Sequence, residues 1–438
     1  MKLHKVGALA AVSILAFAAC SSSTASTKPS TAPAASTAPA ASTAAGDTSK
    51  GKVKIAIELP LQGSDKAASE PIINGIRLAV KDAGGAAGGY EVTVPNSAVY
   101  DDALNGAHDP QTGANNMTKI VADDGYIAVI GPLNSGVAKA QIPISNAAGL
   151  LQCSPANTNT ALTKGPGAAQ LRTKPNNYIR VVTNDANQGP AGADYILDVL
   201  KKKSVYIIDD TETFGKGIAD SFEAEFKARG GTVVKHDAAP KTTQDYVSIM
   251  TAAKALNPES IYFGGVTASG GARILLAAKQ VGMGDIPYIG PDGINDGSGA
   301  TKDSFLNLAK DAAKNSYSTL AGPGTFDGKV AFDAAYKKEY GKDATGYAGQ
   351  GYACAQVVLD ALKRASATSP ANMTALKEAV RVAATDTSAK YTLNVGPVSF
   401  DKDGDTSQLI VSIYSYDPAG AEGKGNWKFD TQVDAAKK

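Results

Sequence analysis

The side chains that most often perform catalysis are scarce in this sequence. It has 3 histidines, of which His4 lies in a leader-like start while His108 and His236 lie far in sequence from any cysteine. The patterns HExxH, GxSxG and CxxC do not occur. Glycine-rich runs at 322–330 and 264–272 lack the spacing of a phosphate loop and of a dinucleotide-binding turn. The sequence therefore favours binding over catalysis, and it predicts no enzyme activity, no cofactor and no metal ion.

One position offers the chemistry of anion binding. Ser135 follows the apolar run 126–131 and begins an amphipathic run, so it is predicted to lie at the N-terminus of a helix. A hydroxyl and free backbone N–H groups at such a place suit a carboxylate. By contrast, the string Asp401–Asp405 fails the spacing of an EF-hand loop, and we predict a tight turn there.

The elements that must position such a site alternate regularly from Val53 onward. We predict strands at 53–59, 91–100, 126–131, 150–153, 204–209, 232–235, 260–263 and 288–290, and helices at 69–83, 110–123, 137–147, 189–202, 214–229, 246–256 and 270–281. Strands that alternate with helices indicate parallel sheets covered on both faces, hence an α/β fold.

The alternation breaks at 178–183, at 316–324 and at 394–405, where a further strand at 409–416 follows. Three breaks predict two doubly wound lobes joined by three hinge crossings. We expect residues 53–180 and 321–395 to form the N-terminal lobe, and residues 181–320 and 396–438 the C-terminal lobe. A ligand cleft between the lobes would face the carboxyl ends of the strands.

The start of the chain is typical of a cleavable export signal. Basic residues precede an apolar run at 6–19 that is shorter than the roughly 20 residues of a membrane-spanning helix. Ala18 and Ala19 before Cys20 resemble the lipobox of bacterial lipoproteins, in which the cysteine is acylated, although Phe17 departs from its usual leucine. An ordinary secretory signal cut nearby is the alternative. Residues 21–52, almost wholly Ser, Thr, Ala and Pro, predict a disordered tether on the order of 30 Å long.

Composition argues against some partners, but it does not determine whether the cysteines form a disulfide. With 43 Lys and Arg against 42 Asp and Glu, the chain offers no sign of a nucleic-acid surface. Nothing indicates an oligomer, so we expect a monomer. Cys153 lies in a strand-like run and Cys354 on the apolar face of a predicted helix. We interpret both as small buried residues; a disulfide between them is the alternative, which two positions alone do not establish.

Several phrases, in their order and spacing, carry a resemblance to a known family. They are GIRLAVKDAGG at 75–85, VYDDA at 99–103, VIGPLNS at 129–135, SPANT at 154–158, NQGPAGADYIL at 187–197, DDTETFGKG at 209–217, IYFGG at 261–265, IGPDG at 289–293 and GYACAQ at 351–356. From Val53 to about Tyr416 the chain resembles the leucine/isoleucine/valine-binding family, the substrate-binding proteins of ABC transporters for branched-chain amino acids. The resemblance implies the type I periplasmic-binding-protein fold.

The resemblance also implies residue roles in a site for a zwitterion. Ser135 would bind the carboxylate. In the segment Ala156-Asn157-Thr158, the carbonyl of Ala156 and the hydroxyl of Thr158 would hold the ammonium group, with the Thr158 N–H on the carboxylate. Asp292, in the other lobe, matches the acidic partner of the ammonium and would reach it when the cleft closes.

Around the ligand side chain the sequence departs from the family. Where aromatic residues are frequent, it has Ala68, Phe214 and Val266, and Tyr347 is the remaining ring. Phe214 keeps the ring without the hydroxyl, while Ala68 and Val266 free volume. The ligand could be bulkier than valine or leucine, or not a branched-chain residue.

Taken together, these patterns predict a lipid-anchored, extracytoplasmic binding protein. It would capture a branched-chain or related amino acid by hinge closure and present it to an ABC permease in the membrane. The alternatives are a ligand-sensing domain for a signalling receptor, and a protein that binds a small solute other than an amino acid. An exported hydrolase with Cys153 as nucleophile is disfavoured, because neither histidine is placed to serve as its base.

Overall fold

The computed structural model describes residues 47–437, so the predicted signal at 1–20, Cys20 and most of the predicted tether lie outside the described residues. The predicted tether at 21–52 overlaps the described residues from 47 to 52. The N–H of Lys50 donates to the carbonyl of Gly89, and the first strand starts at Lys52.

The first sheet is parallel except at one edge, with the order β2-β3-β1-β7-β8-β9 and β4 paired with β1. Its strands are β1 (Lys52–Leu59), β2 (Ala86–Ala87), β3 (Tyr90–Thr93), β4 (Val99–Asp101), β7 (Tyr126–Ile130), β8 (Leu151–Ser154) and β9 (Tyr178–Arg180). The predicted strand at 91–100 is wrong as one element, because a 3-10 turn at Asn96–Ala98 divides it into β3 and β4. Every residue of β7 is buried, as expected of a strand covered on both faces.

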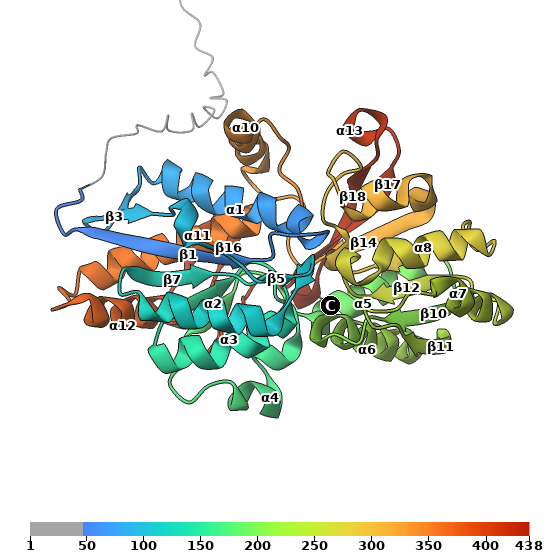
Figure 1. The fold of residues 1–438 in the computed structure, drawn as a ribbon, viewed down its shortest axis with the longest axis horizontal. Coiled ribbons are helices and arrows are strands. Elements are labelled where there is room, and N and C mark those ends of the chain that lie inside the picture. The colour runs from blue at the N-terminus through green and yellow to red at the C-terminus, as the bar shows by residue number, and fades with distance from the viewer. Residues whose placement is uncertain (1–46, 438) are drawn as a thin grey trace, which may run out of the picture. The chain divides into compact units, whose positions relative to one another are not determined.

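Helices cover both faces of this sheet (Figure 1). They are α1 (Asp65–Asp82), α11 (Ala348–Ser366) and α12 (Met373–Ala384) on one face, and α2 (Pro110–Ala122) and α3 (Ser135–Ala148) on the other. Ile55 and Ile57 of β1 contribute to the core under α1 and α11, and Ala56 between them contributes to the core under α2. We call this sheet and its helices the first lobe.

The second sheet has the order β11-β10-β12-β13-β14-β17-β18, parallel through β14 and antiparallel beyond it. Its strands are β10 (Ser204–Asp209), β11 (Thr232–Ala238), β12 (Ile261–Gly264), β13 (Tyr288–Gly290), β14 (Ser316–Leu320), β17 (Ile410–Asp417) and β18 (Asn426–Asp434). One face packs on α7 (Tyr246–Ala255), α8 (Gly271–Gln280) and α9 (Phe305–Ala309), the other on α5 (Asp185–Asp194) and α6 (Thr213–Ala228). We call this sheet and its helices the second lobe.

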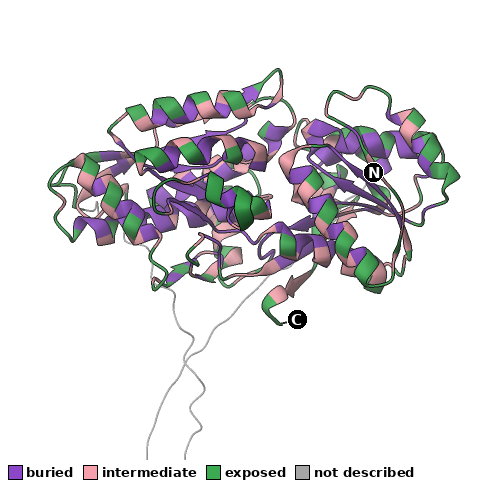
Figure 2. Ribbon diagram, turned by 90° about the horizontal axis from the view of Figure 1, so that it is seen from below, coloured by how far each residue is buried: buried purple, intermediate pink, exposed green. Residues whose placement is uncertain are grey.

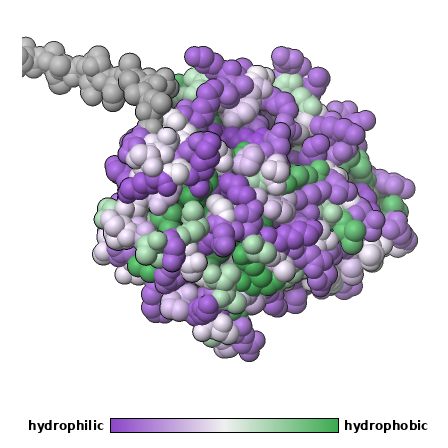
Figure 3. Space-filling view, turned by 60° about the vertical axis from the view of Figure 1, so that its left-hand side comes forward, coloured by the Kyte–Doolittle hydropathy of each residue, from purple (hydrophilic) through white to green (hydrophobic). Residues whose placement is uncertain are grey.

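The helices of both lobes are buried toward the sheets and exposed on the outside, and hydrophilic residues dominate the face seen in space-filling view (Figures 2 and 3). None of the helices between residues 47 and 437 combines the length and apolar character needed to cross a bilayer.

The chain passes between the sheets three times, which confirms the predicted fold class. It leaves the first sheet after β9, returns after β14 to α10 (Lys329–Tyr340) and α11, and leaves again after the hairpin β15–β16 (Tyr391–Leu393, Gly396–Val398). Each strand belongs to the sheet that the predicted lobe boundaries assign it to. The exact boundaries of the lobes stay a prediction. The helices α10 and α12 and the edge strand β18 were not predicted, and the helix predicted around Cys354, now α11, was given no bounds.

The third crossing is tied to the first by a buried ion pair. The predicted turn at Asp401–Asp405 is present, and the carboxylate of Asp401 accepts the N–H groups of Asp403 and Asp405. Asp405 then accepts from Nε of Arg180 at 2.7 Å, and Arg180 is fully buried. The pair therefore links the first crossing to the third.

The interpretation of the two cysteines as separate buried residues is wrong. Cys153 on β8 and Cys354 on α11 form a disulfide, with their Cα atoms 5.9 Å apart. The two residues are 201 positions apart in the chain, and α11 brings Cys354 against the first sheet. Neither of these cysteines is therefore a free thiol in this structure, which removes the nucleophile of the hydrolase alternative.

Candidate functional site

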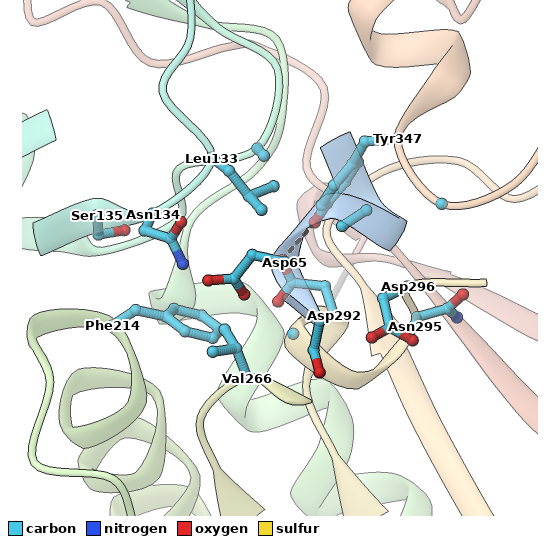
Figure 4. A pocket seen from close by; sticks show the side chains of 15 residues that line it. Asp65, Leu133, Asn134, Ser135, Phe214, Val266, Asp292, Asn295, Asp296 and Tyr347 are labelled. Atoms are coloured by element: carbon cyan, nitrogen blue, oxygen red, sulfur yellow. Dashed lines mark hydrogen bonds between the residues drawn. The ribbon is translucent and has the colours of Figure 1, made fainter. Parts of the chain in front are cut away.

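A pocket lies where the carboxyl ends of the parallel strands of both lobes meet (Figure 4). The first lobe lines it with residues that follow β1 and β7, namely Ser64, Asp65, Ala68, Leu133, Asn134 and Ser135. The second lobe lines it with residues that follow β10, β12 and β13, namely Phe214, Val266, Asp292, Gly293, Asn295 and Asp296. The space not filled by atoms is about 530 Å³, part of which is open solvent.

The N-terminus of α3 faces this pocket. Ser135 is the first residue of α3 and is 1% exposed, and its hydroxyl oxygen accepts the N–H of Asn159 at 3.3 Å. Asn134, the N-cap residue, makes no side-chain cap bond. The first N–H groups of a helix have no partner within it and carry partial positive charge, so this end can bind a carboxylate.

A glycine places this helix end. Gly131 directly follows β7 with φ of +132°, and a Cβ built there would lie 2.0 Å from the carbonyl oxygen of Glu58. Only glycine combines that backbone angle with so close an approach of β1. The turn from β7 into α3 therefore depends on Gly131.

The segment after β8 is only partly in the lining. Ala156 lines the pocket, but Asn157 and Thr158 do not. Asn157 instead donates to the carbonyl of Leu133 at 2.8 Å and accepts from the hydroxyl of Tyr178 at 3.1 Å. The hydroxyl of Thr158 is buried beside the carboxyl group of Asp185, whose pKa burial raises against the lowering effect of this hydroxyl. Asn157 thus holds the neighbouring loop in place, and the predicted ligand contacts of Asn157 and Thr158 stay predictions.

Asp292 lies on the opposite side, directly after β13. Its carboxylate accepts the hydroxyl of Tyr347 at 2.8 Å and the side-chain amide of Gln188 on α5. Burial raises the pKa of Asp292 to about 6, against the lowering effect of these two donors. Tyr347 is the N-cap residue of α11, in the first lobe, so the Tyr347–Asp292 bond joins the lobes.

The remaining predicted residues form an apolar wall. Phe214 near the start of α6 and Val266 after β12 pack together and are both 8% exposed. Ala68 of α1 and Leu133 also line the pocket. The structure therefore brings together Ser135, Ala156, Phe214, Val266, Asp292 and Tyr347 in one lining.

Sequence reasoning missed two acidic residues of the lining, Asp65 and Asp296. Asp65 accepts from Nδ1 of His108 at 2.8 Å, and both side chains are almost fully buried. Burial lowers the pKa of His108, but the charge of Asp65 and its hydrogen bond outweigh this, so the net shift is upward. The sequence did contain a signal for both acids, because each lies shortly after the carboxyl end of a strand. Asp65 lies in the segment 60–65 after β1, and Asp296 in the segment 291–296 after β13.

Comparison with known proteins agrees with this geometry. Residues 52–417 match the family model described as periplasmic binding protein. A Leu/Ile/Val-binding protein of Rhizobium johnstonii is 29% identical over 372 residues, which cover 83% of this chain and 92% of that protein. A leucine-specific-binding protein of Salmonella typhimurium is 27% identical and covers 84% of this chain and 92% of its own length.

Solved structures share the fold. A leucine-binding protein of Thermotoga maritima superposes with a TM-score of 0.74 at 23% identity, over 88% of this chain and all of the other. A solute-binding protein of an ABC transporter from Rhodopseudomonas palustris, in complex with 3,4-dihydroxybenzoic acid, has a TM-score of 0.69 at 21% identity, covering 88% of this chain and 98% of the other.

Proposed function

The chain belongs to the periplasmic binding protein family, and on that premise we propose that it captures an α-amino acid in the pocket between its lobes and delivers it to an ABC permease. Its class is that of extracytoplasmic solute-binding proteins of the ABC-transporter type. The ligand, the residue roles, the closing motion and the lipid anchor are the parts that we propose.

One observation supports an amino acid above other solutes. The N-terminus of α3 and the carboxylate of Asp292 line the same pocket from opposite lobes. The helix end suits a negative group and the buried acid suits a positive one. An α-amino acid carries both groups on adjacent carbons, so a single small molecule can satisfy the two sides and hold the lobes together.

The charge of the lining also argues against an aromatic acid. A bound 3,4-dihydroxybenzoic acid is present in the Rhodopseudomonas palustris structure. In this chain the lining contains Asp65, Asp292 and Asp296 and, among its described residues, no lysine or arginine. A benzoate has no ammonium group to offer Asp292, and it would bring a second negative charge close to that buried acid.

In the proposed mechanism, the open form binds the amino acid on the first lobe through Ser135 and Ala156. Hinge movement at the three crossings then brings Phe214, Val266 and Asp292 onto it. Micromolar affinity corresponds to about −8 kcal/mol, which two charge-assisted contacts and apolar burial can supply. The permease would recognise the closed form, and acylated Cys20 would keep the protein at the membrane.

Isothermal titration calorimetry with a panel of the common L-amino acids, benzoate and glucose tests the proposal. We expect at least one amino acid to bind with micromolar or lower Kd, and Ser135→Ala to weaken it by about tenfold through loss of a hydroxyl donor. Binding of benzoate or glucose, with no amino acid bound, would refute the proposal. For the anchor, Cys20→Ala should move the protein from the membrane fraction to the soluble fraction of cells.

A further inference from the structure

Asp296 is a buried acid in the pocket that the proposed zwitterion does not use. It is 4% exposed and lies four residues beyond Asp292, on the same loop after β13. Its Oδ1 accepts the N–H of Phe305 at 2.9 Å, whereas its buried Oδ2 makes no hydrogen bond of ordinary geometry among the described residues, although the Thr267 side chain lies near enough to lower the pKa of Asp296 against burial, which raises it. Buried carboxyl oxygens without a partner are costly, so this one needs a donor.

The surroundings of Asp296 are negative. Asp65 lines the same pocket, and its charge contributes to the raised pKa of Asp296. The charge of Asp65 is matched by His108, and that of Asp292 would be matched by the α-ammonium group of the ligand. No lysine or arginine among the described lining residues is available to pair with Asp296 when it ionises. Figure 4 shows Asp296 beside Asn295, with Asp292 between Asp296 and the pair Phe214 and Val266.

We propose that the solute is an amino acid with a cationic side chain, such as lysine, ornithine or arginine, whose terminal nitrogen donates to Oδ2 of Asp296. This inference rests on the proposed function, because it assumes that Asp292 binds the α-ammonium group. The apolar wall of Phe214, Val266, Leu133 and Ala68 would cover the methylene stem of the ligand.

An aliphatic side chain would leave this site unsatisfied. Leucine or valine could fill the apolar wall, but either would leave the protonated carboxyl of Asp296 sealed from water without a polar partner on the ligand. A neutral amide would supply one hydrogen bond without compensating the negative charge of the pocket. A cation supplies both, and charge-assisted hydrogen bonds are about twice as strong as neutral ones.

Binding of a cation should also release a proton. Burial raises the pKa of Asp296 to about 8, so the empty site holds its proton at pH 7. When an ammonium or guanidinium group arrives, the carboxyl ionises and its proton passes to the buffer. Binding of leucine would leave Asp296 protonated and release no proton from it.

The test compares L-lysine with L-norleucine, which has the same four-carbon stem without the terminal ammonium, by calorimetry at pH 7. We expect lysine to bind at least tenfold more tightly. Asp296→Asn should reduce lysine affinity at least tenfold and norleucine affinity by less than threefold, since the amide oxygen can still accept from Phe305. The lysine enthalpy of the wild type should vary with the ionisation enthalpy of the buffer, and that of the variant should not.

Asp285→Asn, at an exposed acid of the same lobe, is the matched control and should change neither affinity. Circular dichroism and the urea midpoint of each variant establish that it folds. Tighter binding of norleucine than lysine, or equal losses for both ligands in Asp296→Asn, would overturn the cationic ligand while leaving an amino-acid site intact. If no amino acid binds the wild type, the proposed function itself fails.

Discussion

The titration of Asp292 gives a quantitative prediction for ligand affinity. The ammonium group of the ligand needs an ionised carboxylate, and burial raises the pKa of Asp292 to about 6. Below pH 6, each further decrease of one pH unit raises the ratio of protonated to ionised Asp292 in the empty site about tenfold. We therefore expect the Kd for L-leucine to be nearly constant from pH 7 to 8, and to rise about tenfold at pH 5 and about a hundredfold at pH 4. Leucine is chosen because its side chain has no group that titrates against Asp296.

Calorimetry of wild type, Asp292→Asn and Tyr347→Phe across this pH range is the assay. Asp292→Asn should weaken leucine binding at pH 7.5 by about 10- to 100-fold, the size of a lost charge-assisted hydrogen bond, and should show a flat pH profile. Tyr347→Phe removes a donor that lowers the pKa of Asp292, so the midpoint of its profile should move to higher pH. A wild-type Kd that does not change between pH 7.5 and 5, or an equal slope in Asp292→Asn, would refute the assignment of the ammonium site.

Three further predictions concern stability. Reduction of the Cys153–Cys354 disulfide, or its replacement by two alanines, should lower the free energy of unfolding by about 5 kcal/mol in the chain-entropy model, because the bond closes a loop of 201 residues. Urea titrations of the oxidised and the reduced protein measure this difference. Coincident unfolding midpoints would contradict the prediction. In the same urea titrations, Gly131→Ala should lower the free energy of unfolding by more than about 2 kcal/mol. The control is Gly328→Ala, where φ is +85° and an added Cβ would have no atom within 4 Å. This control should lower the free energy of unfolding by about 1 kcal/mol. Burial raises the pKa of Glu58 to about 7 and that of Asp185 to about 8. The folded state keeps protons that the unfolded chain has lost above pH 5, so the stability of the empty protein should fall from pH 5 to pH 8; a rise over that interval would show that these acids are ionised in the fold.

Much of the architecture is determined by local pattern. The buried run of β7 and the short strand β13 are apolar at consecutive positions, as parallel strands covered on both faces require, and they were predicted within one residue of their bounds. The crossings were predicted because the alternation of strands and helices stops there. What local pattern does not contain is pairing across long separations, so the bond between Cys153 and Cys354 was not deducible from their positions.

In the candidate site, too, some residues were predicted from the sequence and others were missed. Ser135 was predicted from its place at a helix start, and Phe214 and Asp292 from a resemblance in order and spacing, and all three line the pocket. Asp65 and Asp296 were missed because an acid near a helix start or in a turn is common, and only packing of the two lobes shows that both face one pocket.

The long separation between Cys153 and Cys354 has a consequence for biogenesis. A chain that emerges N-terminus first must deliver 201 more residues before Cys153 meets its partner. Strands β10 to β14 follow one another in the sequence and can assemble meanwhile, so the parallel part of the second sheet can form before the first lobe is complete, while β17 and β18 join it last. Of the 3 cysteines in the sequence, the remaining one is Cys20, the only candidate for mispairing within the chain. Acylation of Cys20, as proposed above, would block that thiol. The attached lipid would thereby prevent Cys20 from forming a disulfide with Cys153 or Cys354.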